Sequence, residues 1–399
     1  MKKLFYFAAA AVALAACAKN EVIPVNSGEN QEITFNVAPK TKAEDAPQHT
    51  EFEKDKVFAS WAYYLPEGKT WDENYAVYKS KSVDKNWKPE EDKDYTVPQE
   101  YISGAKISNN ERTGNKWKCE GKSYYWPKDG GSLTFFAYSL NKGNLDFETV
   151  NVEGHDVKRS TVVCQSNTGI FAHIDLSVDK NVDFLVADPA KDKQSNVDKG
   201  KHFVDGVPTL FRHKLSYIIF NVKTDKAYSD AGKTLTLKSI KFNNVSYEGH
   251  YRDIASKSPA ISAGFTSGAK GAVNYTSGST ESPFSQEIKS TNSGISSIDN
   301  YLYIPQTFAD DATIDVVYTI TTKVPKSDDV VETVTKTIKL KELFPTKYDT
   351  SEPRKVIGGG WEMGKKYTIY LTFTLKEILW DPAVQDWDPV TPATDRVVE

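Results

Sequence analysis

The 399-residue sequence contains few of the residues on which metal sites and disulfide-stabilised folds depend, with three cysteines, six histidines and two methionines. Cys119 and Cys164 lie outside any CxxC motif and have no histidine at zinc-ligand spacing, so we expect no structural metal. An exported chain could still oxidise these two thiols, and the sequence leaves their pairing open. Because a GxSxG motif and any recognisable triad or paired-carboxylate pattern are also missing, we expect neither an enzyme nor a cofactor.

Charge of one sign and long apolar runs are scarce as well. The net charge is −4, which gives no reason to expect binding to nucleic acid. Beyond residue 16 no stretch is apolar enough to span a bilayer. Long helical periodicity is nearly absent, whereas threonine and valine recur in alternating runs among 21 tyrosines, 19 phenylalanines and 8 tryptophans. Together these features predict an all-β chain.

The first 17 residues have the features of an export signal. Lys2 and Lys3 form a positive segment, and residues 4–16 form an apolar stretch that is too short to span a membrane. The stretch ends in LAAC at 14–17, the pattern of a bacterial lipobox, in which Cys17 takes a lipid and becomes the new N-terminus. We therefore predict a signal peptide at 1–17 and a lipid on Cys17 as the only membrane anchor. The alternative is an ordinary signal peptide with a cysteine at this position by chance.

The segment GGWEMGKKYTIYLTFTL at 359–375 has the glycine–lysine spacing of a phosphate-binding loop. Such a loop needs serine or threonine after the lysine to hold Mg²⁺, and a helix that directs its backbone N–H groups at phosphate. Here Lys366 follows Lys365, and residues 367–375 alternate apolar and polar side chains as a half-buried strand does. We therefore interpret Gly359 and Gly364 as a turn before a strand and not as a nucleotide site.

Alternating residues bounded by turn residues predict strands throughout the chain. The predicted strands lie at 32–37, 57–64, 183–187, 209–222, 235–245 with a bulge, 301–304 and 367–375, and hairpin-like pairs lie at 117–126 with 132–138 and at 313–323 with 330–340. Residues 71–112 are interpreted as loops with short strands, and 256–297 as an exposed loop. A polar run at 188–205 separates two strand-rich halves. We therefore predict β-sandwich domains at 46–200 and 201–399, after a tether and first strand at 18–45.

Both ends of the mature chain carry strand-like segments next to polar ones. Ile33, Phe35 and Val37 alternate with polar residues and can face a core together. The charged segment directly after them holds Lys40 and Lys42, at which a trypsin-like protease could cut. Near the other end, four apolar residues precede a polar, proline-rich terminus: Leu379, Trp380, Val384 and Trp387.

Taken in order, these segments resemble the fimbrillin-like (Mfa-like) proteins, which are subunits of type V pili in Gram-negative bacteria. The resemblance rests on the lipobox with its short tether and on segments spread over nearly the whole mature chain: ITFNVAPKTKA at 33–43, YYWPKDGGSLTFFAYSL at 124–140, VDFLVA at 182–187, VPTLFRHKLSYIIFNVK at 207–223, LTLKSIKFNNVSYEGHY at 235–251, YLYIPQTF at 301–308 and GGWEMGKKYTIYLTFTLKEILWDPAVQDW at 359–387. Their order and spacing make the resemblance specific.

The resemblance implies two tandem transthyretin-like Greek-key β-sandwich domains and a role in a fimbria that supports adhesion to host or bacterial surfaces. In such proteins a lipid carries the precursor to the outer membrane, a protease removes the first strand, and a strand of another subunit takes its place. On this sequence the cut comes near Lys40 or Lys42, the removed strand holds Ile33, Phe35 and Val37, and the donor comes from 378–399. The family's cleavage often follows arginine, whereas only lysines stand here, so shaft, anchor and tip roles all stay open.

The alternative function is a surface lipoprotein that binds glycans or adheres as a monomer. Four tryptophans could line a carbohydrate-binding face: Trp61, Trp71, Trp117 and Trp126. In a β-sandwich such side chains more often belong to the core or to sheet edges.

Two further patterns have a functional and a plainer interpretation. His213 lies in a predicted strand, and a lone histidine there is expected to be structural and not catalytic. Asp175, Asp179 and Asp183 recur every four residues, which could suggest calcium, but they lack the glycine and glutamate of a calcium loop. We expect these aspartates on a solvated edge.

Overall fold

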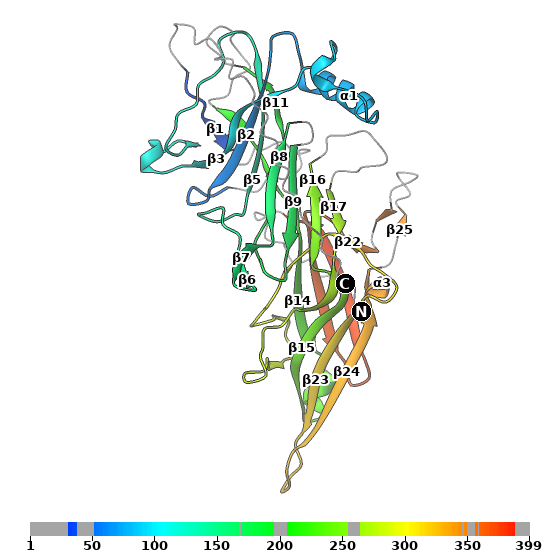
Figure 1. The fold of residues 1–399 in the computed structure, drawn as a ribbon. Helices are drawn as coiled ribbons and strands as arrows, with labels where there is room; N and C mark the ends of the chain where they lie inside the picture. The colour runs from blue at the N-terminus through cyan, green and yellow to red at the C-terminus, as the bar shows by residue number, and fades with distance from the viewer. Residues whose placement is uncertain are drawn as a thin grey trace.

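The computed structural model describes residues 31–37, 52–166, 169–194, 206–253, 264–344, 347–348, 356–357 and 359–387. Most of the regular structure in these ranges is β-strand, which confirms the predicted all-β class. The molecule is elongated, with the N-terminal half at one end and the hairpin of β23 (Thr313–Thr322) and β24 (Val330–Lys339) at the tip of the other (Figure 1). None of the helices in the described ranges is long and apolar enough to cross a membrane.

The C-terminal half is built from two sheets that share one core. The first sheet has the order β20 (Ser293–Gly294), β14 (Ser216–Thr224), β28 (Lys365–Phe373) and β29 (Ile378–Asp386), and β21 (Leu302–Tyr303) also pairs with β14. The second has the order β18 (Lys270–Asn274), β15 (Lys233–Ser246), β23 and β24, and β19 (Gln286–Ile288) also pairs with β15. The predicted β23–β24 hairpin is present, and the register of β15 shifts between Leu237 and Ser239, where a bulge is predicted.

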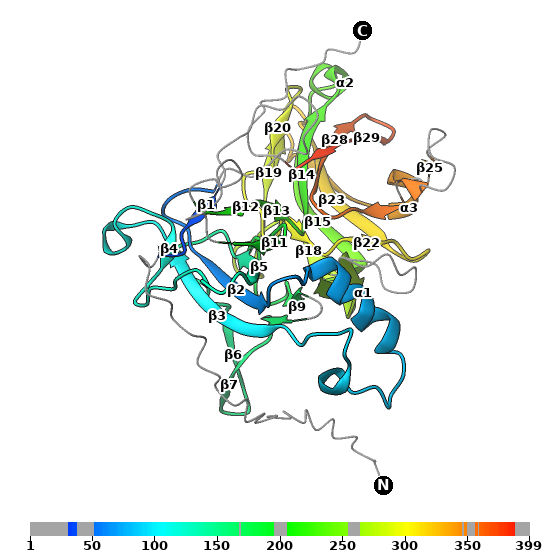
Figure 2. The same ribbon diagram turned by 90° about the horizontal axis from the view of Figure 1, so that it is seen from above.

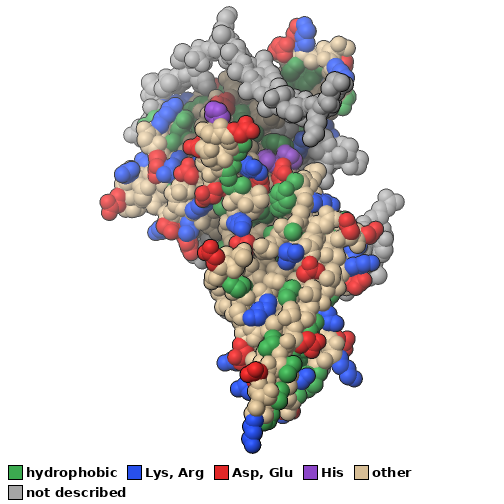
Figure 3. All heavy atoms as spheres, turned by 60° about the horizontal axis from the view of Figure 1, so that its bottom comes forward, with side chains coloured by type: hydrophobic (Ala, Val, Ile, Leu, Met, Phe, Trp, Pro, Cys, Tyr) green, Lys and Arg blue, Asp and Glu red, His purple; other side chains and the backbone are tan. Residues whose placement is uncertain are grey.

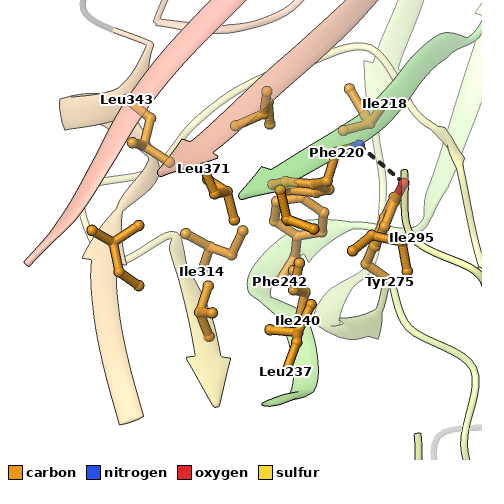
Figure 4. Packing of buried hydrophobic residues seen from close by; sticks show 14 of the residues in the cluster. Ile218, Phe220, Leu237, Ile240, Phe242, Tyr275, Ile295, Ile314, Leu343 and Leu371 are labelled. Carbon is orange, nitrogen blue, oxygen red and sulfur yellow. Dashed lines mark hydrogen bonds between the residues drawn. The ribbon is translucent and has the colours of Figure 1, made fainter. Parts of the chain in front are cut away.

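Alternation along the strands explains why these two sheets face each other. In β14 every second side chain is buried, and the apolar ones point into the core. Phe220 of β14 packs near Phe242 of β15, and the backbone N–H of Phe220 donates a hydrogen bond of 3.1 Å to the hydroxyl of Tyr275 (Figure 4). A buried N–H without an acceptor would cost about 1–3 kcal/mol. The hydroxyl of Tyr275 therefore stabilises the core by accepting this hydrogen bond.

The N-terminal half contains a seven-stranded sheet, here called the central sheet. Its order is β13 (Phe211–His213), β10 (Leu185–Ala187), β5 (Ser132–Ser139), β2 (Phe58–Leu65), β3 (Gln99–Ser108) and β4 (Lys118–Cys119), and β11 (Ala190–Lys193) also pairs with β5. A four-stranded sheet packs on one face of it, in the order β17 (Gly264–Ser267), β16 (Glu248–Arg252), β9 (Gly169–Asp175) and β8 (Thr161–Gln165). Phe136, Tyr138, Ile174 and Tyr251 belong to the core between these two sheets.

The opposite face of the central sheet is also buried. It is covered by β1 (Phe35–Val37), which runs parallel to β12 (Val207–Thr209) at its side (Figure 2), and by the chain at 117–126. All eight residues of β5 are buried, with Phe135 in the core under β1 and Phe136 in the core under the four-stranded sheet. A strand that is buried on both faces shows no alternation in its sequence, and SLTFFAYS at 132–139 shows none.

Strands from beyond residue 201 complete the sheets of the N-terminal half. β13 pairs with β10, and β16 pairs with β9. The first residues of the polar run at 188–205 also belong to this half, because β11 pairs with β5 of the central sheet. The division into 46–200 and 201–399 stays a prediction about folding units, and these units share hydrogen-bonded strands across the predicted boundary.

The structure corrects the interpretation of 71–112 as loops with short strands. This segment holds the helix α1 (Trp71–Lys81), the short 3₁₀ helix η1 (Pro89–Glu91) and the ten-residue strand β3, and η2 (Glu111–Thr113) follows. α1 has few apolar residues and no amphipathic stripe, so hydrophobic periodicity does not reveal it. The signal that remains is its N-terminal cap, in which the hydroxyl of Thr70 accepts a hydrogen bond from the N–H of Glu73.

Two further expectations are wrong. The segments 117–126 and 132–138 do not form a hairpin, because β4 pairs with β3 whereas β5 pairs with β2. The described part of 256–297 is not simply an exposed loop, since it holds β17, β18, β19 and β20. Four of its apolar side chains are buried in the C-terminal core: Tyr275, Phe284, Ile288 and Ile295. Sparse apolar residues still form a core when each of them faces inward.

The remaining elements are short: β6 (Thr149–Val152) with β7 (His155–Lys158), α2 (Lys226–Asp230), β22 (Gln306–Thr307) with β27 (Gly360–Trp361), α3 (Leu340–Leu343), and β25 (Lys347–Tyr348) with β26 (Val356–Ile357). The predicted turn is confirmed, because Gly359 and Gly364 both have a positive φ and β28 follows them. Cys119 and Cys164, whose pairing the sequence leaves open, are free thiols in different sheets. Burial raises the pKa of both thiols.

Candidate functional site

The first strand lies in a slot on the second face of the central sheet. Ile33 and Phe35 are 2% and 5% exposed, whereas Val37 is half-buried. The ring of Phe35 meets Phe58 of β2 edge-on, with 5.4 Å between ring centroids, and meets Phe135 of β5 at 5.8 Å. The structure therefore places Ile33 and Phe35 in the core and Val37 at its margin.

Main-chain hydrogen bonds hold this strand on both sides. The N–H groups of Ile33 and Phe35 donate to carbonyl oxygens of the chain at 117–126, over 2.7 and 2.8 Å. On the other side, the N–H of Val207 donates to the carbonyl of Thr34 over 2.7 Å, and β1 continues in parallel register with β12. The slot is thus a gap between two backbone edges that one extended segment fills.

The slot also requires Gly206, which no sequence pattern described above identifies. Its φ is +106°, and a Cβ atom there would lie 2.8 Å from the carbonyl carbon of Phe35 and 2.9 Å from the backbone nitrogen of Asn36. Both separations are shorter than any ordinary van der Waals contact, so only glycine lets the first strand pass. The motif DGVPT at 205–209, a glycine before a strand that contains proline, is the signal that could have indicated it.

A network of polar contacts fixes the start of the strand. The carboxylate of Glu32 accepts hydrogen bonds from Ser123 Oγ at 2.5 Å and from Lys118 Nζ at 3.2 Å. Burial raises the pKa of Glu32, but the hydrogen bonds from Ser123 and Lys118 and the positive charges of Lys118 and Lys116 together outweigh burial, so the pKa lies below its ordinary value. A lowered carboxylate pKa stabilises the docked strand at neutral pH. That contribution is lost as the pH falls from the unfolded-state pKa through the folded-state pKa.

The last described strand, β29, lies at the edge of the first C-terminal sheet. It pairs antiparallel with β28 along its whole length, and no described strand pairs with its other edge. Leu379 and Val384 are 50% and 52% exposed, while Trp380 packs against the C-terminal core. The candidate donor residues, Trp387 included, therefore lie on their own subunit in this structure. Donation of β29 would require its separation from β28.

Trp387 lies where the central sheet meets the first C-terminal sheet. Its indole stacks on the imidazole of His213 with 3.8 Å between ring centroids, and the ring of Tyr217 lies 5.2 Å away. His213 Nδ1 is 2.9 Å from a carboxylate oxygen of Asp183, which fixes the orientation of the buried imidazole. His213 therefore has the structural environment that the sequence predicts, and it anchors the end of β29 to β13.

The four tryptophans that could line a glycan-binding face belong mainly to the cores. Trp71 and Trp126 are buried, while Trp61 and Trp117 are half-buried against the two N-terminal cores. On the face that Figure 3 shows, acidic and basic side chains are interspersed and no large area carries one sign. These four tryptophans thus do not form an exposed aromatic platform.

The aspartates spaced by four do not lie on a solvated edge, contrary to expectation. Asp175 and Asp179 are buried. The carboxylate of Asp175 accepts hydrogen bonds from the N–H and hydroxyl of Ser177, and that of Asp179 accepts one of 2.7 Å from the N–H of Glu148. Asp183 pairs with the buried histidine described above. The carboxylates of Asp175 and Asp179 each brace a loop, because a short acceptor satisfies N–H groups that no strand partner reaches.

Cys17, Lys40 and Lys42 lie outside the described residues, so the lipid attachment and the cut stay predictions. The predicted cleavage segment nevertheless lies between two described segments of the same core. Phe35 precedes it, and Phe52, the first described residue after it, stacks on Phe211 of β13 at 4.7 Å. A cut between residues 37 and 52 would therefore leave the first strand held by non-covalent contacts alone.

The chain is also similar to known proteins. The model of the family described as fimbrillin-like matches residues 67–387, which is most of the chain. A comparison with curated proteins finds no match. A solved fimbrial protein from Bacteroides vulgatus is similar over 90% of this chain and 100% of its own, with 16% identity and a TM-score of 0.52, which supports the fold.

Two further solved structures are less similar. One, described as a cell adhesion protein from Bacteroides uniformis, has 14% identity and a TM-score of 0.43 over 89% of this chain and 99% of its own. The other, the fimbrial anchor protein Mfa2 from Porphyromonas gingivalis, has 11% identity and a TM-score of 0.31 over 90% of this chain and 98% of its own. At these scores neither adds to the argument on the fold.

Proposed function

Because the chain belongs to the fimbrillin-like family, we propose that it is a structural subunit of a fimbria and that it supports cell adhesion by strand exchange. The proposed role is mechanical and not enzymatic. Its partners are other pilus subunits, and its place is the cell surface or the fimbrium. An anchor would keep its N-terminus and first strand, whereas a shaft subunit would lose them, so removal of the first strand is the step to test.

The observation that carries the proposal is the slot of the first strand. The occupant is short and extended, its apolar side chains enter the core at alternate positions, and the charged segment with Lys40 and Lys42 follows it. Its hydrogen bonds to 117–126 and β12 are made by main-chain atoms, which any extended segment can replace. Main-chain pairing supplies affinity, while pockets for alternate side chains supply register.

Removal of the first strand leaves a surface that has to be covered again. Phe58 and Phe135 lie beneath it, and the N–H of Val207 loses its acceptor. An apolar floor between two unpaired backbone edges is a template for a strand of another chain. Because each subunit then fills a slot with one segment and offers its own slot to the next subunit, the contact does not close on itself and builds a filament.

We propose that the donor comes from 378–399. Within this segment β29 is already an edge strand, with Leu379 and Val384 exposed on it. Either β29 separates from β28 and enters the neighbouring slot, or the residues beyond Trp387 do so while β29 stays in place. Chains that end at Trp387 and at Lys376 distinguish these two routes, because the first keeps β29 and the second removes it.

Limited trypsin digestion of the detergent-free protein is expected to cut after Lys40 or Lys42 and to convert monomers into ladders or fibres. Mass spectrometry identifies the new N-terminus, and size-exclusion chromatography and electron microscopy measure the assembly. The double variant Lys40→Gln/Lys42→Gln is the matched control and should stay monomeric under the same digestion, since its first strand remains covalently attached. A chain that is cut but lacks the donor should also stay monomeric.

Two results would contradict this prediction. A cut protein that stays monomeric at high concentration, with residues 31–37 still bound, would contradict strand exchange and a shaft role. An anchor that keeps its first strand would give that result. Fibres formed equally well by the double variant would show that assembly does not pass through the slot at all.

We also propose that Cys17 carries the lipid that holds the precursor in the outer membrane, on the basis of the LAAC motif. Cys17→Ser is expected to abolish labelling with a palmitate analogue and to move the protein from the membrane fraction to the soluble fraction. Cys119→Ser is the control, because that thiol lies in β4 and should not affect labelling. A Cys17→Ser protein that stays in the membrane fraction would overturn the lipid assignment.

A further inference from the structure

The outer face of the four-stranded sheet carries two histidines next to each other. His173 of β9 and His250 of β16 are directly opposite in the antiparallel register, and Glu248 lies two residues before His250. Residues two apart in a strand share a face, so Glu248 points to the same side as His250. Their sequence neighbours Ile174 and Tyr251 are buried in the core, which places the three polar side chains on the outside.

These three side chains are close enough to share one ion. Their candidate ligand atoms all lie within 4.8 Å of one another, and they are the group of this kind found among the described residues. His173 Nε2 lies 2.7 Å from Glu248 Oε1, and the rings of His173 and His250 are stacked with 4.7 Å between centroids. His173 and Glu248 are half-buried and His250 is exposed, so an ion could enter from solvent.

The hydrogen bond made by Nδ1 of His173 determines whether Nε2 faces Glu248 with a proton or with a lone pair. His173 Nδ1 lies 2.8 Å from the carbonyl oxygen of Arg159, which can only accept, so Nδ1 carries a proton. In the neutral ring Nε2 then presents a lone pair to a carboxylate oxygen 2.7 Å away, and two acceptors at that distance repel each other. Either a second proton or a metal ion removes this repulsion. A backbone carbonyl that accepts from the other ring nitrogen is also the usual support of a metal-bound histidine.

We propose that His173, Glu248 and His250 bind a divalent transition-metal ion, for which Zn²⁺ is the reference. Two imidazole nitrogens and one carboxylate oxygen are donors that suit Zn²⁺, and they leave a fourth tetrahedral position to solvent. Because His173 comes from β9 and the other two ligands from β16, the ion would link a strand from before residue 200 to one from beyond residue 201.

Binding requires a small rearrangement that the exposed ligand can make. Metal bonds of about 2.0–2.2 Å in tetrahedral geometry bring ligand atoms to roughly 3.3 Å from one another. His250 is the exposed member of the group, so its side chain can turn towards the other two without moving the core.

Positive charges on the same face oppose the ion and limit its affinity. Arg159 lies 3.6 Å from Asp175 at one side of the group, and Arg252 lies over the ring of Phe171 at the other. Like charges near the site weaken the binding of a cation. We therefore expect a dissociation constant on the order of 10 µM, weaker than that of a structural zinc site.

Isothermal titration of the full-length, tag-free protein with ZnCl₂ tests the site. We expect one ion per chain, and His173→Gln, Glu248→Gln and His250→Gln should each weaken binding by about tenfold or more. His155→Gln is the matched control, because His155 is an exposed histidine of β7 outside the group and its loss should leave binding unchanged. Circular dichroism spectra establish that every variant is folded.

A second readout reports the coordination itself. With Co²⁺ in place of Zn²⁺, we expect visible absorption bands of a four-coordinate ion in the wild type and in His155→Gln but not in His250→Gln. Zn²⁺ binding with unchanged affinity in the three ligand variants, or no binding at millimolar ZnCl₂, would overturn the proposal.

Discussion

Replacing Phe35 with alanine is expected to lower the free energy of unfolding of the uncut protein by about 3–5 kcal/mol. The ring is 5% exposed and packs between Phe58 and Phe135, so its removal leaves a cavity that two paired strands cannot close. Urea unfolding followed by tryptophan fluorescence measures the loss, because the indole of Trp117 packs against the same core and its backbone carbonyl accepts a hydrogen bond from the N–H of Phe35.

The matched control is Asn36→Ala, in the same strand. Asn36 is half-buried beside Phe35, and its replacement should change the free energy of unfolding by less than about 1 kcal/mol. After proteolytic removal of the first strand, both variants and the wild type should be equally stable, because the changed residue has left with the strand. If the uncut Phe35→Ala protein loses almost no stability, the first strand does not stabilise the central sheet through this side chain.

Ending the chain at Lys376 is expected to destabilise the C-terminal half by at least about 4 kcal/mol. The truncation removes β29, and with it the burial of Ile378 and Trp380 on the core and the stack of Trp387 on His213. Full burial of an apolar side chain contributes about 1.5–3 kcal/mol; Ile378 is buried, and the two half-buried tryptophans contribute part of that amount each. Thermal unfolding measures the overall loss, and hydrogen exchange of the β28 amides, which lose their partners, locates it.

A chain that ends at Trp387 is the control, because it keeps every contact of β29 that the structure describes. It should unfold at the same temperature as the full-length protein. If the chain that ends at Lys376 unfolds as cooperatively and at the same temperature too, β29 adds no stability to its own subunit. That result would make β29 a better candidate for the donor strand than the residues beyond Trp387.

Half-buried strands are the part of the fold that could be predicted from the sequence. β14 and β28 alternate, because one of their faces packs on the core, and the β23–β24 hairpin is bounded by a clear turn. β5 shows no alternation because both of its faces are buried. Its local sequence pattern therefore could not indicate that it pairs with β2. α1 has no apolar stripe for periodicity to detect. Local sequence therefore predicted elements better than it predicted their partners.

The candidate sites show the same limit. Ile33 and Phe35 could be assigned to one inward face by alternation, but the walls of their slot, Trp117 and Gly206, come from distant parts of the chain. The histidine pair depends on the register of β9 against β16, and no short motif records that register. Side chains that are adjacent only through strand pairing cannot be grouped until the pairing is known.

β1 precedes the other described strands in the chain, yet both of its walls come late. The bridge to Trp117 and the pairing with Val207 close loops of roughly 80 and 170 residues, a contact order that makes docking slow. We therefore expect β1 to dock after the strands of the central sheet have paired. Interactions that form after the folding nucleus alter the rate of unfolding far more than the rate of folding. We therefore expect the contacts of β1 to slow unfolding of the assembled protein much more than they change the rate at which the central sheet forms.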